Sequence, residues 1–237
     1  MEDVTIIIQG KILQECYDFY IENYKNYKVI ISTWVGSNID FSNIPHNFSL
    51  IQHTIPEVKG PQNTNLQLVS TLNGLKFATT KYVIKIRGDE YYSNFESVAH
   101  FIKKNDNKIY TSPIWFRHWS FEKYHASDHI VAGTKDRVTL FFQSAKDSFD
   151  KNQFETYYPE ILFTKSYLKA VEPYRFENID GRILMLDHFE ILDLVPMKPY
   201  RIEAKIYFTS FYNDFIPENN YSISNIHKLF DETPYKV

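Results

Sequence analysis

The chain has 237 residues, of which 43% are hydrophobic and 23% are charged, a composition typical of globular proteins and not of disordered ones. Its length predicts one large domain that buries a substantial core. The formal net charge of −3 supplies no basic field, so we expect no nucleic-acid partner. Cys16 is the one cysteine, which excludes an internal disulfide and multi-cysteine metal centres and favours a reducing compartment.

The start of the chain, Met1-Glu2-Asp3, lacks the positive region and the apolar stretch of a secretory signal. The apolar run 183–195 is interrupted by charged residues and falls short of the about 18 consecutive apolar residues that a membrane span needs. We therefore expect a cytoplasmic protein without a membrane span. The aromatic fraction of 17% indicates either an A/T-rich coding bias or aromatic surfaces lining a pocket. Such a bias fits an A/T-rich bacterium or a large DNA virus, in which case the location is the host cytoplasm.

Short β-branched runs alternate with segments of helical periodicity. The pattern predicts strands at 4–9, 28–34, 49–53, 82–87 and 108–112, and helices at 13–25, 63–77, 95–103 and 181–194. This alternation predicts an α/β fold in a single domain. Ligands of such folds bind outside the carboxyl ends of the strands, so we expect Gln9, Gly10, Thr33 and Trp34 at the crevice.

The strand predicted at 82–87 ends in Gly88-Asp89-Glu90, the most informative point of the sequence. Carboxylates in this position suit Mg²⁺ or Mn²⁺, which bind through one or two carboxylates and substrate phosphates. Arg87 would assist at a diphosphate through charge-assisted hydrogen bonds. The alternative is an ordinary turn, with Arg87 and Glu90 forming a surface pair.

The segments 61–75 and 80–93 resemble the WavE lipopolysaccharide-synthesis family, whose members look like glycosyltransferases with the GT-A fold. In that family, a helix bearing Asn and Gln and ending in Gly-Leu precedes a strand ending Lys-x-Arg-x-Asp. The matching residues here are Asn65, Gln67, Gly74, Leu75, Lys85, Arg87 and Asp89. Segment 125–133 is similar to the family's Ser-Asp-His block, and the resemblance covers roughly residues 4–145.

The resemblance implies a GT-A-like, Rossmann-type mixed sheet flanked by helices. It also implies transfer of a sugar from a nucleotide-sugar donor to a hydroxyl of a glycan or lipopolysaccharide-type acceptor. Residues 1–112 would form the donor half, and residues 113–237 the acceptor half with the tail. The donor-binding residues it implies are Gln9, Gly10, Thr33, Asn65, Gln67, Lys85, Arg87, Asp89 and Glu90.

A divalent metal, Mn²⁺ or Mg²⁺, is also implied by the resemblance, with Asp89 as one ligand. Tyr91 stands where many GT-A enzymes carry a second Asp, which leaves the metal requirement open. His227 matches the late histidine that such enzymes sometimes supply to the metal, although a structural or solvated histidine is the alternative. His188 beside Asp187 is open to the same two interpretations.

Asp128 is our candidate for the general base that deprotonates the acceptor hydroxyl. Two alternatives remain: Asp128 caps a helix that begins near His129, or it is simply exposed at the surface. His125, Asp128 and His129 would also share one face of a helix, as metal ligands do, but no His-Glu-x-x-His pattern accompanies them.

Six ring-bearing residues crowd the segment 115–124, namely Trp115, Phe116, His118, Trp119, Phe121 and Tyr124. This segment predicts either an acceptor platform or a hydrophobic lid or homodimer contact. Two other functions remain open: a nucleotidyltransferase acting on a sugar phosphate, and a non-catalytic carbohydrate-binding or assembly protein with the same fold. The first strand is followed only by Gln9-Gly10-Lys11, which lacks the Gly-rich phosphate loop that nucleotidyltransferases commonly show.

Overall fold

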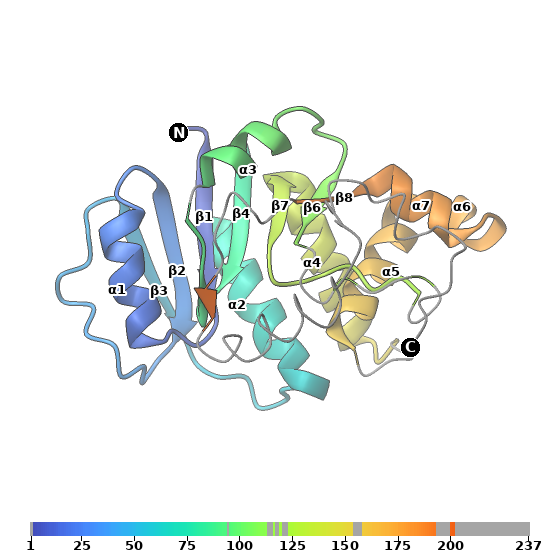
Figure 1. Ribbon diagram of the computed structural model, residues 1–237. Coiled ribbons are helices and arrows are strands. Elements are labelled where there is room, and N and C mark those ends of the chain that lie inside the picture. The colour runs from blue at the N-terminus through green and yellow to red at the C-terminus, as the bar shows by residue number, and fades with distance from the viewer. Residues whose placement is uncertain are drawn as a thin grey trace, which may run out of the picture.

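A computed structural model describes residues 2–93, 95–112, 116, 119, 123–153 and 158–192, and the backbone of 200–201. In this part of the chain, seven strands form one sheet in the order β3-β2-β1-β4-β7-β6-β8 (Figure 1). The strands are β1 (Val4–Gln9), β2 (Lys28–Trp34), β3 (Phe48–His53), β4 (Tyr82–Arg87), β6 (Ile109–Thr111), β7 (Val131–Thr134) and β8 (Phe189–Ile191). A second, two-stranded sheet pairs β5 (Glu90–Tyr91) with β9 (Tyr200–Arg201).

The sheet is mixed. Strands β3, β2, β1 and β4 run parallel, and this 3-2-1-4 order is that of a Rossmann-type half. Strand β7 is antiparallel to both β4 and β6, whereas β6 and β8 are parallel. The carboxyl ends of β1, β2 and β4 therefore meet at one edge of the sheet.

Helices pack against both faces of the sheet. They are α1 (Gln14–Asn23), α2 (Thr64–Phe77), α3 (Phe95–Ile102), α4 (Lys135–Asp150), α5 (Pro159–Val171), α6 (Pro173–Asn178) and α7 (Gly181–His188), with a 3₁₀ turn at Pro61–Asn63. Side chains of α1 and α3 share one buried cluster, and those of α2, α4 and α5 share the other. Because strand side chains alternate, Ile6 and Ile8 of β1 enter the first cluster while Ile7 enters the second.

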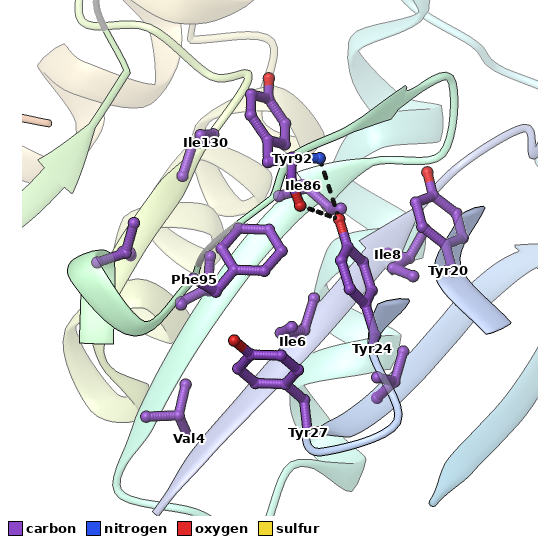
Figure 2. Packing of buried hydrophobic residues seen from close by; sticks show 14 of the residues in the cluster. Val4, Ile6, Ile8, Tyr20, Tyr24, Tyr27, Ile86, Tyr92, Phe95 and Ile130 are labelled. Carbon is purple, nitrogen blue, oxygen red and sulfur yellow. Dashed lines mark hydrogen bonds between the residues drawn. The ribbon is translucent and has the colours of Figure 1, made fainter. Parts of the chain in front are cut away.

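Tyrosines fill much of the first cluster and use their hydroxyls to satisfy backbone groups. The Tyr24 hydroxyl donates to the carbonyl oxygen of Tyr92 at 2.8 Å and accepts from its amide at 3.0 Å (Figure 2). Tyr24 also packs edge to face on Phe95, with 5.2 Å between ring centroids. Part of the high tyrosine content therefore serves the core, where the hydroxyls of Tyr20, Tyr24, Tyr82, Tyr92 and Tyr110 each have a hydrogen-bond partner.

The mixed α/β sheet flanked by helices confirms the predicted fold class, and the five predicted strands correspond to β1, β2, β3, β4 and β6. The helix predicted at 181–194 is wrong in its second half, since α7 ends at His188 and β8 follows directly. Backbone pairing of β8 with β6 explains the difference, because residues 189–191 form a strand that buries Phe189 and Ile191. Among the described residues, the structure has no helix long and apolar enough to cross a membrane.

Candidate functional site

The loops that follow β1 and β4 are joined at the carboxyl edge of the sheet. The Gly10 amide donates to the carbonyl oxygen of Ser32 at 2.9 Å, and the Gly88 amide donates to that of Gln9 at 2.8 Å. Gln9 and Thr33 are buried here, and neither Gln9 Oε1 nor Thr33 Oγ1 has a hydrogen-bond partner among the described residues. Two polar atoms at the predicted crevice thus lack the partner that buried groups normally have.

Arg87 and Asp89 form a bidentate pair just beyond β4. Arg87 Nε and Nη2 donate to Asp89 Oδ1 and Oδ2, both at 2.9 Å. The two side chains are 31% and 25% exposed, so solvent and ligands can reach them. Burial of the guanidinium acts to lower the pKa of Arg87, but the hydrogen bonds to Asp89 and the charge of Glu90 outweigh it, and the net shift is upward.

Glu90 points into the protein, unlike its neighbour Asp89. Its side chain is 1% exposed, with Oε2 accepting from the Tyr92 hydroxyl at 2.6 Å and Oε1 lying 2.5 Å from His129 Nδ1. Arg87 Nε lies 3.6 Å from the same Oε1 atom. Arg87 and Glu90 thus do form a pair, but its expected place at the surface is wrong, because the Glu90 carboxylate is buried against His129 and Tyr92.

A second buried contact joins β4, α2 and the segment before β7. Gln67 Nε2 donates to Asp128 Oδ2 and Lys85 Nζ donates to the Asp128 carbonyl oxygen, each at 2.5 Å. Burial lowers the pKa of Lys85 to about 8 despite the nearby Asp128. Burial acts to raise the pKa of Asp128, but the charges of Lys85 and His129 lead a group of interactions that hold it below its ordinary value.

The other oxygen of Asp128, Oδ1, has no hydrogen-bond partner among the described residues, and His129 Nε2 lies 3.9 Å from it. Asp128 is 3% exposed, so the surface interpretation is wrong. The capping interpretation is wrong as well, because no helix begins at His129 and β7 starts at Val131. Without a helix there, His125, Asp128 and His129 do not share a helical face, and His125 instead lies 3.8 Å from Glu160 Oε2.

The remaining predicted residues lie apart from this network or outside the described chain. Asn65 Nδ2 donates to the Val58 carbonyl oxygen at 2.6 Å, so Asn65 fixes the loop that enters α2. His188 is buried beside Glu172, with 3.4 Å between Nε2 and Oε1. His227, Trp115, His118 and Phe121 lie outside the described residues.

Sequence reasoning missed the partnership of Glu90 with His129. The two residues are 39 positions apart, and the local sequence contains no signal that pairs them. The adjacent positions of Asp128 and His129 in one polar block were the available hint, because buried polar groups need partners.

The site does not offer the ligand set that a divalent metal needs within the described residues. Of the two neighbouring carboxylates, Asp89 and Glu90, solvent reaches Asp89, and both of its oxygens already accept hydrogen bonds from Arg87. Glu90 is turned inward, and no group of three or more His, Cys, Asp or Glu side chains converges as a ligand set within the described ranges. The described residues alone therefore do not fit a divalent metal.

Fold and site together define an α/β protein with a charged polar site at the carboxyl ends of its parallel strands, the place where such folds bind ligands. The chain belongs to the WavE lipopolysaccharide synthesis family, whose model matches residues 6–166. A similar solved structure is the apo-form glycosyltransferase GlyE from Streptococcus pneumoniae TIGR4, at 13% identity and a TM-score of 0.48. The match covers 91% of this chain and 51% of GlyE, so the chain spans about half of that protein's length. A search of curated proteins finds no match.

Proposed function

We propose that this protein is a glycosyltransferase that moves a sugar from a nucleotide-sugar donor to a hydroxyl of a glycan or lipopolysaccharide-type acceptor. Membership of a lipopolysaccharide-synthesis family supports the substrate class. The single observation that supports the site is the half-buried Arg87–Asp89 pair just beyond β4. It lies at the edge where α/β folds receive their ligands.

The Arg87–Asp89 pair carries groups suited to two parts of a nucleoside diphosphate, the diphosphate and the ribose. The Arg87 guanidinium offers a planar fork of donors that matches phosphate oxygens, and it stays charged at every working pH. The Asp89 carboxylate accepts hydrogen bonds from ribose hydroxyls. Donor binding would replace part of the internal Arg87–Asp89 contact with contacts to the ligand, so these two side chains, already half-buried, would lose little further hydration.

Asp128 is proposed as the general base of an inverting transfer. Its pKa lies below the ordinary value, which keeps the carboxylate ionised at neutral pH, and Oδ1 retains a free lone pair among the described groups. Gln67 fixes the other oxygen, and Lys85 fixes the backbone of the same residue. These contacts would hold the carboxylate in one orientation, with Oδ1 buried until an acceptor enters.

The donor site is tested by a thermal-shift screen of nucleoside diphosphates and nucleotide sugars, with and without Mn²⁺. A ligand that binds only the folded protein raises Tm through mass action. We expect one nucleotide class to raise Tm in the wild type and not in Asp89→Ala. The matched control is Asp150→Ala, which removes an exposed carboxylate on α4 and should leave the ligand shift unchanged.

The chemistry is tested by product analysis. A glycosyltransferase should release the nucleoside diphosphate slowly from its nucleotide-sugar donor even without acceptor. Release of pyrophosphate from a mixture of a nucleoside triphosphate and a sugar phosphate would instead indicate a nucleotidyltransferase. Asp128→Asn should abolish transfer while the donor still raises Tm. Transfer at the wild-type rate in Asp128→Asn would show that Asp128 is not the base. If no nucleotide changed the Tm of the wild type, the proposal would be overturned in favour of a binding or assembly role.

A further inference from the structure

A pocket of about 660 Å³ lies between the segment before β7 and the start of α7, apart from the Arg87–Asp89 pair. Its volume lies in the range of small-molecule sites. The residues that line it are Trp119, Lys123, Tyr124, Asp180, Gly181 and Arg182. It therefore combines an aromatic wall with two cationic side chains and one anionic side chain.

The aromatic wall is held in place by packing. Tyr124 adopts the left-handed backbone conformation with φ +62°, which non-glycine residues populate sparsely and surrounding contacts must maintain. Its ring packs edge to face on Trp119 at 4.8 Å between centroids and lies 5.4 Å from Phe176. A Cβ at Gly181 would overlap the Tyr124 hydroxyl, so only glycine allows this approach of the ring to α7.

The charges of the pocket do not cancel. Arg182 donates to Asp180 Oδ2 from Nε at 2.8 Å and from Nη2 at 2.6 Å, which pairs these two charges. These hydrogen bonds hold the pKa of Asp180 below its ordinary value, and the charge of Lys123 contributes in the same direction. Lys123 is exposed and adds a second positive charge at the rim, so the lining carries a net charge of about +1.

We propose that this pocket binds an anionic sugar unit of the acceptor, a pyranose bearing a carboxylate or a phosphate. Trp119 offers an apolar face to the sugar ring, and Lys123 and Arg182 receive the anion. This inference rests on the proposed function. Asp128 lies four positions after Tyr124, a span of at most about 14 Å, so a glycan that leaves the pocket reaches the region of the proposed base within a few sugar units.

The test is an NMR titration of the full chain with three probes: methyl β-glucuronide, glucose 6-phosphate and the uncharged methyl β-glucoside. The chain has three tryptophans, and Trp119→Phe identifies the indole N–H resonance of Trp119 by removing it. We expect titration of this resonance to give a Kd for the anionic probes at least about tenfold lower than for the glucoside, because the glucoside lacks one charge-assisted hydrogen bond. The carboxylate and phosphate arms distinguish the two kinds of acidic sugar.

Lys123→Ala should weaken binding of the anionic probe by about tenfold and leave the rest of the spectrum unchanged, because Lys123 is exposed. Lys25→Ala, which removes an exposed lysine in the turn between α1 and β2, is the matched control and should have no effect. Equal affinity for charged and uncharged probes, or unchanged affinity in Lys123→Ala, would overturn the pocket assignment. If the pocket test fails but a nucleotide still raises the Tm of the wild type, the pocket assignment alone has failed. If no nucleotide raises the Tm either, the proposed function has failed.

Discussion

Lys85 is buried on β4 with 0% exposure, and its substitution by methionine tests the electrostatics of the site. Methionine preserves an unbranched side chain of similar length against the Phe142 ring, which lies 5.8 Å from Lys85 Nζ. It removes the charge opposite Asp128 and the hydrogen bond to the Asp128 carbonyl oxygen. The variant therefore isolates the contribution of one buried ammonium group.

The size of the effect follows from the pKa of Lys85, which burial lowers from 10.5 to about 8. Between these two values the unfolded chain binds a proton at this position that the folded protein does not, so the free energy of unfolding rises with pH. The full difference of about 2.5 pKa units corresponds to about 3 kcal/mol, since one pKa unit is worth about 1.36 kcal/mol. About two thirds of it, roughly 2 kcal/mol, falls between about pH 7.5 and pH 10.

The assay is urea unfolding at several pH values across that window for the wild type, Lys85→Met and Lys28→Met. Lys28 begins β2 with an exposed side chain, so it controls for the loss of a lysine without burial. Relative to Lys85→Met, the wild type should gain roughly 2 kcal/mol as the pH rises, and relative to Lys28→Met it should gain almost nothing. A difference between wild type and Lys85→Met that does not change with pH would refute the assignment of a low Lys85 pKa.

Two further substitutions test the buried network and the core. Glu90→Gln should destabilise the protein by about 2 kcal/mol in urea unfolding, because the partners His129 and Tyr92 stay buried while the charge of the carboxylate is lost. A loss below about 0.5 kcal/mol, the scale of surface substitutions, would show that the network contributes little. Phe141 is 0% exposed, and Phe141→Ala should lower the free energy of unfolding by about 3–5 kcal/mol. Phe77 is 61% exposed, and Phe77→Ala should lower it by less than about 1 kcal/mol. Comparable losses of stability in the two variants, measured by thermal unfolding, would contradict the described core.

The parallel half of the fold could be predicted because its signals are local. The β-branched runs of β1, β2 and β4 are buried on both faces, and each is followed by a glycine within two residues, so strand identity and the position of the edge follow from the sequence. The side chains of Gln9, Thr33 and Arg87 accordingly occur near that edge. The rule for parallel connections adds a right-handed crossover from β1 through α1 to β2, but strand order and register come from the structure alone.

The second half could not be predicted as well, because its partners are distant in sequence. Strand β7 is only four residues long and contains Gly133, and its antiparallel insertion between β4 and β6 leaves no periodic signal. Helix α4 did carry a readable pattern, with Val138, Phe142, Ala145 and Phe149 buried at three- and four-residue spacings.

The site residues divide in the same way. Arg87 and Asp89 lie two positions apart, and their pairing is a local property of the chain. The inward turn of Glu90 depends on His129, which reaches it only through the tertiary fold. A sequence motif can thus indicate where charge gathers, while the direction of each carboxylate depends on partners brought in from other elements.

The tyrosine hydroxyls of α1 have a consequence for how a ligand would be received. Tyr20 donates to the carbonyl oxygen of Glu90, and the Tyr24 hydroxyl bridges the amide and carbonyl of Tyr92. The segment that carries Asp89 is therefore held by the buried side chains of Tyr20 in α1 and Tyr24 at its end before any ligand arrives. The entropy of ordering it is lost on folding and not on binding. The Tyr92 amide should exchange with deuterium only through global unfolding, and nucleotide binding should leave its exchange rate nearly unchanged apart from the gain in overall stability.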